Sequence, residues 1–309
     1  MKEKNIFDCI IIGGGPAGLT AGIYTGRAML KTLLFKGKGG EMNLAGEVDD
    51  FPGFPKGITG YKLLSLMEEQ VKKFKVEIKE EEITSVNLSL YPFKVTSSLN
   101  KNYYAESIII ATGAKNRWLN LDNEKKLIGR GISVCAICDG AFFKNKEVAV
   151  VGGGDVAIEN ALYLTKYARK VYVVHRRDQL RASKIFQEEA FKNPKIEFML
   201  NYKVKEIIGD KWLEKIVILN NKTLRQKELS VQGLFISIGY EPNSDLFKNQ
   251  IEINENGYIK TADNVKTSKE GVFASGDVCD SKYRQAITAA GFGAMAAIEA
   301  EKWLRKINS

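Results

Sequence analysis

The chain has 309 residues, which suits two domains better than one at roughly 150 residues per domain. Hydrophobic residues make up 44% of it and charged residues 27%, values near the average of globular proteins, which excludes long disorder and fibrous repeats. The 46 basic and 37 acidic residues leave a net charge of +9, but both signs alternate along most of the chain without a long basic block. We therefore expect no nucleic-acid partner, and instead a solvated surface with one or two local anion sites.

No apolar run reaches the roughly 18 to 20 residues that a membrane-spanning helix needs. The N-terminus has two lysines and a short apolar stretch, without the apolar length or the small-residue cleavage site of a signal peptide. We therefore expect a cytoplasmic protein with no membrane association. Four cysteines in that compartment do not predict a disulfide framework.

The first structural unit begins near the N-terminus. The β-branched run 7–12 predicts a buried parallel strand, residues 19–29 predict a helix, and residues 31–35 predict a second strand. Between the first strand and the helix stands GGGPAG at 13–18, a G-x-G-x-x-G fingerprint in the context that a dinucleotide site requires.

Each glycine of this fingerprint has its own role. Gly13 permits the tight turn, Gly15 lets a pyrophosphate approach the backbone, and Gly18 lets the helix pack against the strand. The helix N-terminus then offers N–H groups and a partial positive charge to the phosphates.

A second unit repeats the first. It has a predicted strand at 147–151, GGGDVA at 152–157, a helix through about Tyr167 and a strand at 170–174. Two fingerprints in the correct context predict two bound dinucleotides.

The spacing of the two units is the same. Lys36 follows Gly13 by 36 − 13 = 23 residues, and His175 follows Gly152 by 175 − 152 = 23. Lys36 and His175 therefore stand at equivalent places, at the end of the second strand. Lys36 is compatible either with a phosphate contact or with a surface loop.

Both units lack the acidic residue that commonly hydrogen-bonds a ribose 2′-OH. In the second unit its place is taken by His175, Arg176 and Arg177, with Arg181 four residues further on. Arginine forks suit a 2′-phosphate, which predicts NADPH rather than NADH, and the alternative is a solvated basic turn. We expect His175, the only histidine, to contact adenosine rather than to act in acid–base catalysis.

The C-terminal part of the chain resembles a continuation of the first unit. Residues 254–272 contain short strand-like pieces, and residues 285–303 predict a helix dense in alanine and glycine. The second unit is then inserted into the first, with crossings near 113–117 and 239–245. The fold class we predict is α/β, with two Rossmann-like, three-layer nucleotide-binding domains, one inserted into the other.

Cys135 and Cys138 form a C-x-x-C pair at the predicted start of a helical turn. Zinc needs four ligands, and apart from the pair only Cys9, Cys279 and one histidine remain, so we expect no metal site. Two ordinary buried cysteines are an open alternative. A redox dithiol is favoured, because the spacing permits a reversible disulfide and a helix start lowers a thiol pKa. Asp139 stands beside Cys138, where it can deliver or accept the proton of thiol–disulfide exchange. We expect Cys9 and Cys279 to be structural.

These motifs resemble those of bacterial low-molecular-weight thioredoxin reductases, a family of FAD- and NADPH-dependent flavoproteins. The resemblance extends from end to end, in the family's order, and its motifs are GGGPAG at 13–18, ATG at 111–113, CAICDG at 135–140, GGGDVA at 152–157, HRRDQLRA at 175–182, FASGDV at 273–278 and YRQAITAAGFGAMAA at 283–297.

The resemblance implies the cofactor contacts. The residues that would bind FAD are Gly13, Gly15, Pro16, Ala17, Gly18, Gly39, Gly40, Glu41, Asn43, Thr112, Gly113, Gly276, Asp277, Arg284, Gln285 and Ala286. Those that would hold NADPH are Gly154, Asp155, His175, Arg176, Arg177, Arg181, Ile238 and Gly239. The FAD-binding domain would comprise residues 1–114 and 246–309, and the NADPH-binding domain with the C-x-x-C pair residues 115–245.

The resemblance also implies an activity. NADPH would reduce FAD, FADH2 would reduce the Cys135–Cys138 disulfide, and the dithiol with Asp139 as acid would reduce oxidised thioredoxin or a thioredoxin-like protein. A homodimer is implied on the same basis.

Three residues depart from the family pattern. Glu41 stands where Gln is common, Asp50 where Asn is common, and Lys36 where some members have Glu. These departures concern the flavin and ribose contacts and leave the electron path intact.

Other functions fit the sequence less well. A ferredoxin– or flavodoxin–NADP reductase lacks the dithiol, and the flavoprotein of a peroxiredoxin reductase system carries an additional N-terminal dithiol domain. Ferredoxin-dependent thioredoxin reductases lack the second glycine motif and the arginines. A flavin-binding protein without redox activity would not need the dithiol.

Overall fold

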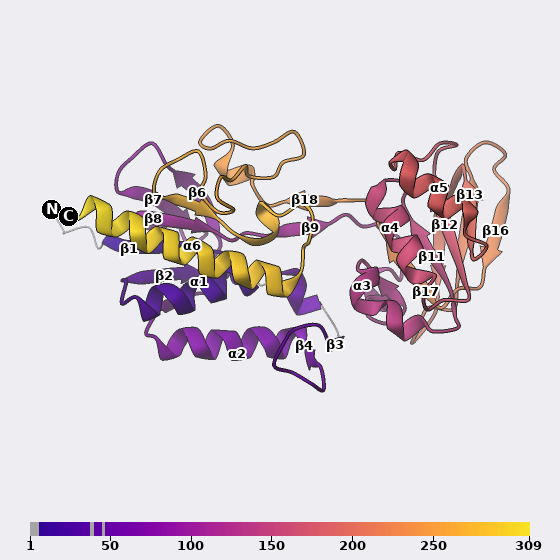
Figure 1. Cartoon of the computed structure of the whole chain (residues 1–309), viewed down its shortest axis with the longest axis horizontal. Coiled ribbons are helices and arrows are strands. Elements are labelled where there is room, and N and C mark those ends of the chain that lie inside the picture. Colours follow the sequence, from indigo (N-terminus) through magenta and orange to yellow (C-terminus); the bar gives the residue numbers. More distant parts are fainter. Residues whose placement is uncertain (1–5, 38–39, 45–46) are drawn as a thin grey trace. The chain divides into compact units, whose positions relative to one another are not determined.

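The structure is a computed structural model that describes residues 6–37, 40–44 and 47–309. The chain forms two compact units, which we call the outer unit (residues 1–115 and 241–309) and the inserted unit (residues 116–240) (Figure 1). Both contain a parallel sheet with helices, so the α/β class expected from the sequence is confirmed. Where the chain crosses between the units, β9 (Ala114–Asn116) pairs with β18 (Tyr240–Pro242).

The outer unit is built on a sheet with the strand order β5-β2-β1-β8-β7-β6, in which β19 also pairs with β8. Strands β5, β2, β1, β8 and β19 are parallel, and β7 runs antiparallel to both β8 and β6. The strands are β1 (Ile6–Ile12), β2 (Thr32–Phe35), β5 (Glu77–Lys79), β6 (Ile83–Asn87), β7 (Phe93–Ser97), β8 (Asn102–Ile110) and β19 (Val272–Ala274), and the helices are α1 (Pro16–Arg27), α2 (Gly60–Lys73) and α6 (Ala286–Ile307). A short ribbon of β3 (Glu47–Val48) and β4 (Ile58–Thr59) precedes α2.

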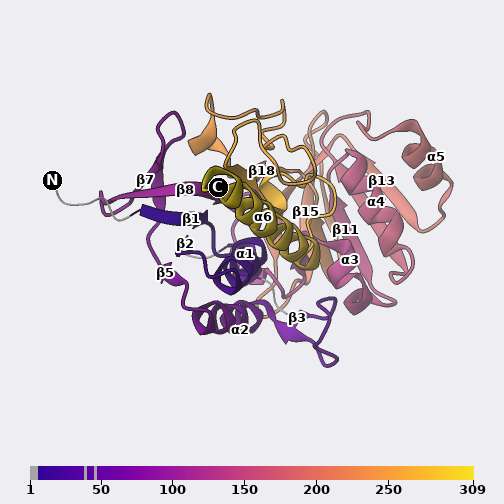
Figure 2. The same ribbon diagram turned by 60° about the vertical axis from the view of Figure 1, so that its left-hand side comes forward.

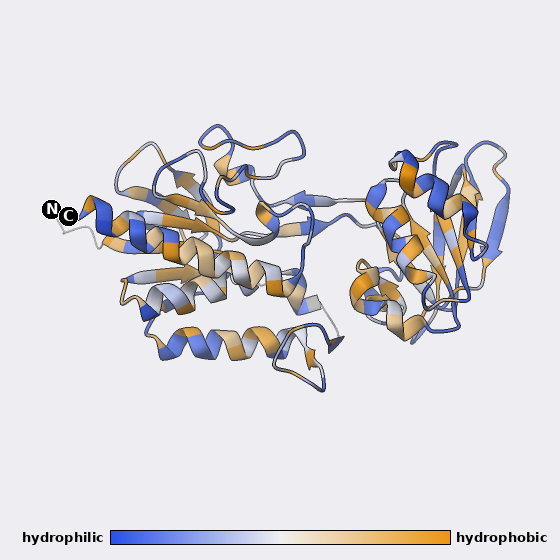
Figure 3. Cartoon of the chain, in the orientation of Figure 1, coloured by the Kyte–Doolittle hydropathy of each residue, from blue (hydrophilic) through white to orange (hydrophobic). Residues whose placement is uncertain are grey.

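Alternate strand residues of this sheet feed two cores. Ile11 and Leu34 pack under the helices, whereas Ile10 and Leu33 pack on the opposite face. Helix α1 packs against both α6 and α2 on one side of the sheet, as Figures 1 and 2 show. The sheet strands are mostly hydrophobic, while the exposed faces of α2 and the end of α6 are hydrophilic (Figure 3).

The inserted unit has three layers. Its central sheet is wholly parallel, in the order β10-β17-β11-β12-β13. One face packs against α4, and the other packs against an antiparallel sheet of β14, β15 and β16. The strands are β10 (Ile132–Ser133), β11 (Glu147–Val151), β12 (Lys170–His175), β13 (Ile196–Leu200), β14 (Tyr202–Ile208), β15 (Lys215–Asn220), β16 (Gln226–Leu229) and β17 (Gly233–Ile236), and the helices are α3 (Ala136–Asp139), α4 (Asp155–Leu164) and α5 (Lys184–Lys192).

Helix boundaries differ in places from the sequence-based prediction. Helix α6 continues to Ile307 rather than to residue 303, and α1 ends at Arg27 rather than at residue 29. Helix α1 begins at Pro16 rather than at residue 19, because proline is well suited to the first turn, where its missing N–H is not needed. Helix α4 ends at Leu164 rather than near Tyr167, and the next three residues form tighter turns in which each N–H bonds three residues back. In the described part of the chain, no helix has the length and apolar character required to cross a membrane.

Two glycines of α6 differ in how much room they have, because one of them faces α1. A Cβ on Gly293 would lie 2.0 Å from the carbonyl oxygen of Ala17 in α1, whereas a Cβ on Gly291 would meet no atom within 4 Å. We expect Gly293→Ala to lower the free energy of unfolding by about 1–3 kcal/mol through overpacking. The matched variant Gly291→Ala should raise it by up to about 1 kcal/mol, because alanine is the better helix former. Denaturant unfolding measures both values, and equal effects of the two variants would contradict this packing.

Candidate functional site

Each unit has a glycine loop between a parallel strand and the helix that follows it, between β1 and α1 in the outer unit and between β11 and α4 in the inserted unit. The two loops share one backbone geometry. Gly13 has a φ of +126° and Gly152 a φ of +152°, both in the region that favours glycine. A Cβ at Gly13 would lie 2.0 Å from the carbonyl oxygen of Ala111, and one at Gly152 would lie 2.3 Å from that of Ser237. Glycine therefore lets each loop pass close to the end of the neighbouring strand.

The N-cap residue of the helix that follows each loop is a glycine. Gly15 is the N-cap of α1 and Gly154 the N-cap of α4, and neither helix has a side-chain cap. A Cβ on either glycine would meet no protein atom within 4 Å. Because the first N–H groups of an α-helix have no partner within the helix, this open backbone fits a pyrophosphate. Both loops therefore fit a dinucleotide.

The strand after each glycine-loop helix, β2 in the outer unit and β12 in the inserted unit, ends at the same place beside the loop. A Cβ on Gly14 would lie 2.4 Å from the Cβ of Lys36, and one on Gly153 would lie 2.4 Å from the ring of His175. The equal spacing in the sequence thus corresponds to one structural position beside each glycine loop.

Lys36 is engaged by two carboxylates. Its Nζ lies 2.8 Å from Glu80 Oε1 and 3.0 Å from Glu68 Oε2, and its side chain is 24% exposed. The hydrogen bond to Glu80 is the main cause that raises the pKa of Lys36. Of the two alternatives that the sequence left open for Lys36, a phosphate contact or a surface loop, these ion pairs disfavour the phosphate contact.

Most predicted FAD residues lie at the carboxyl ends of the outer unit's parallel strands. Thr112 and Gly113 follow β8, and Gly276 follows β19, where a Cβ would lie 3.0 Å from the Cβ of Ala17. Asn243, which the sequence analysis missed, holds the first of these segments. Its Nδ2 donates to the carbonyl oxygen of Thr112 at 2.8 Å, and Thr112 Oγ1 donates to the Asn243 carbonyl oxygen at 2.7 Å.

The predicted residues after β2 lie in a separate short turn. Gly40 precedes the 3₁₀ turn η1 (Glu41–Leu44), which contains Glu41 and Asn43, and the N–H of Asn43 donates to the Gly40 carbonyl oxygen at 2.9 Å. Gly39 lies outside the described residues.

Asp277 is a carboxylate in an unfavourable environment. It lies in the 3₁₀ turn η5 (Gly276–Val278), and burial is the main cause that raises its pKa to about 6. The charges of Asp280 and Glu41 raise the pKa further, and Arg284 opposes them. Glu41, one of the departures from the family pattern, therefore does act on the predicted flavin site electrostatically.

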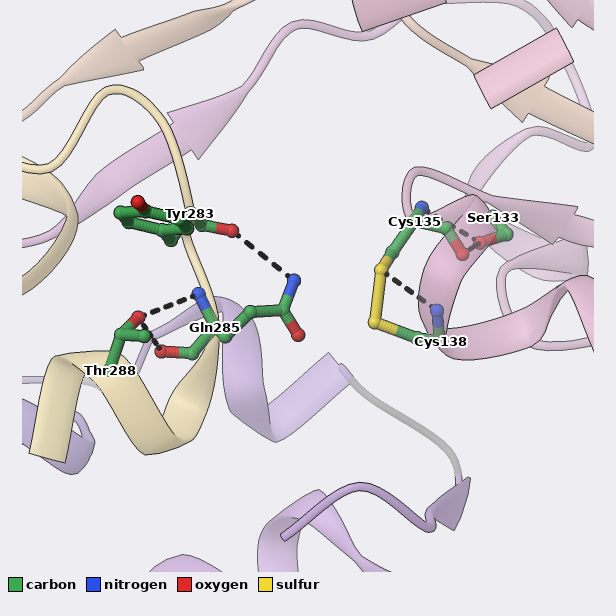
Figure 4. Close-up of a disulfide and its surroundings, with 6 residues drawn as sticks. All are labelled: Ser133, Cys135, Cys138, Tyr283, Gln285 and Thr288. Carbon is green, nitrogen blue, oxygen red and sulfur yellow. Dashed lines mark hydrogen bonds between the residues drawn. A yellow bond between two sulfur atoms is a disulfide. The ribbon is translucent and has the colours of Figure 1, made fainter. Parts of the chain in front are cut away.

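Helix α6 begins beside this turn. Gln285 is its N-cap, with Ala286 as the first helical residue, and Thr288 Oγ1 accepts from the N–H of Gln285 at 3.3 Å (Figure 4). Gln285 Nε2 also donates to the carbonyl oxygen of Tyr283 at 3.2 Å. The backbone of Gln285, which lies between the predicted FAD residues Arg284 and Ala286, is thereby tied to the first turn of the helix.

In the inserted unit, the arginine-bearing turn is bound to the glycine loop. The N–H groups of Arg181 and Ala182 donate to the carbonyl oxygen of Gly153 at 2.6 and 3.1 Å. The N–H of Ser183 donates to Asp155 Oδ1 at 2.7 Å. Asp155, predicted to contact NADPH, thus also holds the turn that carries the arginines.

His175 is buried beneath this turn. Its Nε2 donates to the carbonyl oxygen of Gln179 at 3.1 Å, so the neutral ring carries its proton on Nε2. Burial, followed by the charges of the neighbouring arginines, lowers the pKa of His175. The ring is therefore neutral at pH 7, and its predicted adenosine contact stays a prediction.

Three arginines surround the buried ring. Arg176, Arg177 and Arg181 are exposed, and none of them has an ion pair within the part of the chain that the structure describes. The intervening acid, Asp178, is paired with Lys222 at 3.0 Å. Exposed guanidinium groups with no acidic partner fit a 2′-phosphate.

Ile238 and Gly239 lie directly after β17. They are preceded by Ser237, whose carbonyl oxygen would lie 2.3 Å from a Cβ on Gly152. Gly239 has a φ of +107°, and its carbonyl oxygen accepts from the N–H of Arg117 at 3.0 Å. Both predicted NADPH residues therefore lie at the same edge of the sheet as the glycine loop.

Cys135 and Cys138 are joined by a disulfide, with their Cα atoms 5.4 Å apart (Figure 4). Cys135 is the N-cap of α3, and its Sγ accepts from the N–H of Cys138 at 3.1 Å. Ser133 Oγ accepts from the N–H of Cys135 at 3.0 Å, which fixes the strand-to-helix turn. Cys138 is exposed, and Asp139 follows it in the last position of α3. A disulfide at an exposed helix start is accessible to thiol exchange.

The other two cysteines differ in environment. Burial raises the pKa of Cys9 and of Cys279 to about 12 in each case, so both are protonated and unreactive at pH 7. Across the described ranges, no three His, Cys, Asp or Glu side chains form a group that could hold a metal ion.

Comparisons with known proteins agree with this geometry. The family model for pyridine nucleotide-disulphide oxidoreductases matches residues 7–293. The thioredoxin reductase of Rickettsia felis is 48% identical over 303 residues, covering 96% of this chain and 98% of that protein. The thioredoxin reductase of Streptomyces coelicolor is 46% identical over 309 residues, covering 99% and 96%. The crystal structure of thioredoxin reductase from Streptococcus pyogenes has a TM-score of 0.93 at 39% identity, covering 98% of this chain and 100% of that chain. This chain therefore belongs to the pyridine nucleotide-disulphide oxidoreductase family, in the thioredoxin reductase branch.

Proposed function

We propose that the protein reduces the disulfide of thioredoxin or of a thioredoxin-like protein with electrons from NADPH, through FAD and the Cys135–Cys138 pair. The observation that carries the proposal is the C-x-x-C disulfide at an exposed helix start, in a chain that also has two open glycine loops. FAD and NADPH are the cofactors of the family to which the chain belongs. The outer unit would bind FAD and the inserted unit NADPH. The domain boundaries predicted from the sequence, 114/115 and 245/246, differ slightly from those of the two units, 115/116 and 240/241.

The two glycine loops carry different nucleotides in this proposal. The exposed arginines beside Gly154 support NADPH at the inserted unit. Among the described residues directly after β2 in the outer unit, the basic side chain is that of Lys36, which is paired with acids, and this supports a nucleotide without a 2′-phosphate there. Bound FAD would supply two-electron transfer between NADPH and the disulfide.

The cysteine pair acts in two steps. Two electrons and two protons convert the Cys135–Cys138 disulfide into a dithiol. One thiolate then attacks the partner's disulfide to form a mixed disulfide, and the second thiol attacks that bond, which re-forms Cys135–Cys138 and releases the partner as a dithiol. Asp139 would protonate the sulfur that leaves.

The homodimer and the cytoplasmic location belong to the same proposal. The homodimer rests on the resemblance to the family. The location is supported by the use of the cysteines, since a dithiol that cycles with NADPH needs a reducing compartment.

The first experiment concerns the dithiol. Flavin reduction needs only NADPH, so Cys135→Ser and Cys138→Ser should each retain NADPH-driven bleaching of the flavin at about 450 nm. Each should abolish turnover with thioredoxin, because exchange needs both sulfurs. Cys279→Ser is the matched control and should keep turnover, since a serine hydroxyl can replace the Sγ that donates to the Gly276 carbonyl oxygen. Thioredoxin reduction by the double variant Cys135→Ser/Cys138→Ser would disprove the electron path.

A second experiment concerns nucleotide choice. Each arginine–phosphate contact is worth on the order of 1.5–3 kcal/mol, so losing two should cost about 10²- to 10⁴-fold in preference for NADPH. Arg176→Ala/Arg181→Ala should raise the KM for NADPH by that factor and leave NADH kinetics nearly unchanged. Arg225→Ala, which removes another exposed arginine of the inserted unit, should change neither value. Equal losses with both nucleotides would show that the arginines are structural.

A third experiment concerns Asp277. Its folded pKa of about 6 lies above the ordinary value of 3.8, so the carboxylate destabilises the fold as pH rises through that window. At pH 7.5 the cost reaches up to about 3 kcal/mol in the FAD-free protein. Asp277→Asn should therefore raise the melting temperature of FAD-free protein at pH 7.5, with a gain that shrinks toward pH 4. It should also weaken FAD binding, because bound FAD would lose a charged hydrogen-bond acceptor.

The control for this experiment is Asp245→Asn, an exposed aspartate whose pKa is lowered by Lys248. It should not raise the melting temperature at any pH. A pH-independent effect of Asp277→Asn would contradict the assigned pKa.

A further inference from the structure

The turn between η5 and α6 is organised by one buried carboxylate, that of Asp280, which is 8% exposed. Its Oδ1 accepts from the N–H groups of Lys282 and Tyr283 at 2.8 and 2.9 Å, and its Oδ2 accepts from the N–H of Arg284 at 3.1 Å. Three charge-assisted bonds to one carboxylate are enough to offset the cost of burying it.

Asp280 connects two segments that the proposed FAD site needs. On one side, the N–H of Asp280 donates at 2.9 Å to the carbonyl oxygen of Gly276, which is the residue before Asp277. On the other side it binds Arg284, which has a φ of +50°, in the left-handed region that residues other than glycine rarely adopt. The next residue, Gln285, is the N-cap of α6.

The charge of Asp280 disfavours the ionised forms of two neighbouring side chains. Asp280 raises the pKa of Asp277 and of Cys279, which shows that its charge acts on both neighbours. An asparagine would relieve that repulsion but would present an N–H₂ group toward backbone N–H donors on one side. Only an ionised carboxylate accepts on both oxygens, so the turn keeps an acid despite the repulsion.

We propose that Asp280 is the positioning residue of the FAD site. Its carboxylate fixes the turn 281–284 and thereby sets the start of α6 relative to Gly276 and Asp277. The proposal rests on the proposed function, because the FAD contacts of these segments are themselves part of it.

The test uses the purified holoenzyme and follows FAD release by the rise of flavin fluorescence after dilution. Loss of charge-assisted bonds should speed FAD release by about tenfold to a hundredfold in Asp280→Ala. Asp280→Asn should show a smaller increase, because one oxygen still accepts. In both variants we also expect the visible absorption bands of the bound flavin to shift, since its surroundings change.

Two control variants separate positioning from general stability. Leu304→Ala creates a cavity at the far end of the same helix, where Leu304 is 3% exposed, and should lower the melting temperature while FAD release stays within about twofold. Asp263→Asn removes an exposed aspartate of the outer unit and should change neither value. A flavin spectrum like that of the unmodified protein, with release no faster than in Leu304→Ala, would overturn the proposal for Asp280.

The outcomes also distinguish this inference from the function on which it rests. Absence of FAD from the unmodified protein would refute the proposed function itself. If Asp280→Ala does not fold, the test is decided by Asp280→Asn, whose unchanged release would overturn the positioning role.

Discussion

The close approach of a glycine loop to the end of a neighbouring strand is the constraint on which both units depend. The glycine loop, which follows β1 in the outer unit and β11 in the inserted unit, lies against a backbone carbonyl oxygen, that of Ala111 or that of Ser237, at a distance that excludes a Cβ. This contact brings the start of the following helix to the carboxyl edge of the parallel sheet. The other candidate residues follow from it, because they stand where the remaining strands end at the same edge.

Much of this arrangement could be predicted because it depends on local sequence. The two fingerprints, their equal spacing to Lys36 and His175, and the short helix start at Cys135 are all features of contiguous segments. The inserted topology followed from the order of those segments along the chain. Helix boundaries were wrong by two to four residues, since Pro16 starts a helix that we expected only after the glycines, α4 tightens before Tyr167, and α6 continues to Ile307.

The residues that sequence analysis missed act through partners that are distant in the chain or through the backbone. Asn243 binds Thr112 across 131 residues. Lys36 bonds Glu68 across 32 residues, so its role depends on where α2 packs and was not readable from its neighbours. Asp280 accepts only backbone N–H groups, and such bonds leave no motif apart from an acid shortly before a helix. The distinction between the cysteine pair and the two structural cysteines, by contrast, was predicted from the sequence, and burial of Cys9 and Cys279 supplies its physical cause.

Charge separates the two nucleotide sites. The inserted unit, residues 116–240, has 22 basic and 14 acidic residues, so it carries +8 of the chain's net charge of +9. The arginines of its turn, Arg176, Arg177 and Arg181, contribute to this positive charge. Asp178 in the same turn does not neutralise them, because its carboxylate is paired with Lys222. The outer unit is nearly neutral, and the groups around its candidate site are the carboxylates Asp277, Asp280 and Glu41, with Arg284 opposing them. Carboxylates accept hydrogen bonds from hydroxyls and repel extra phosphates, whereas exposed guanidinium groups attract them. The same glycine loop can therefore serve two nucleotides in one chain, because the side chains beyond the loop select the ligand.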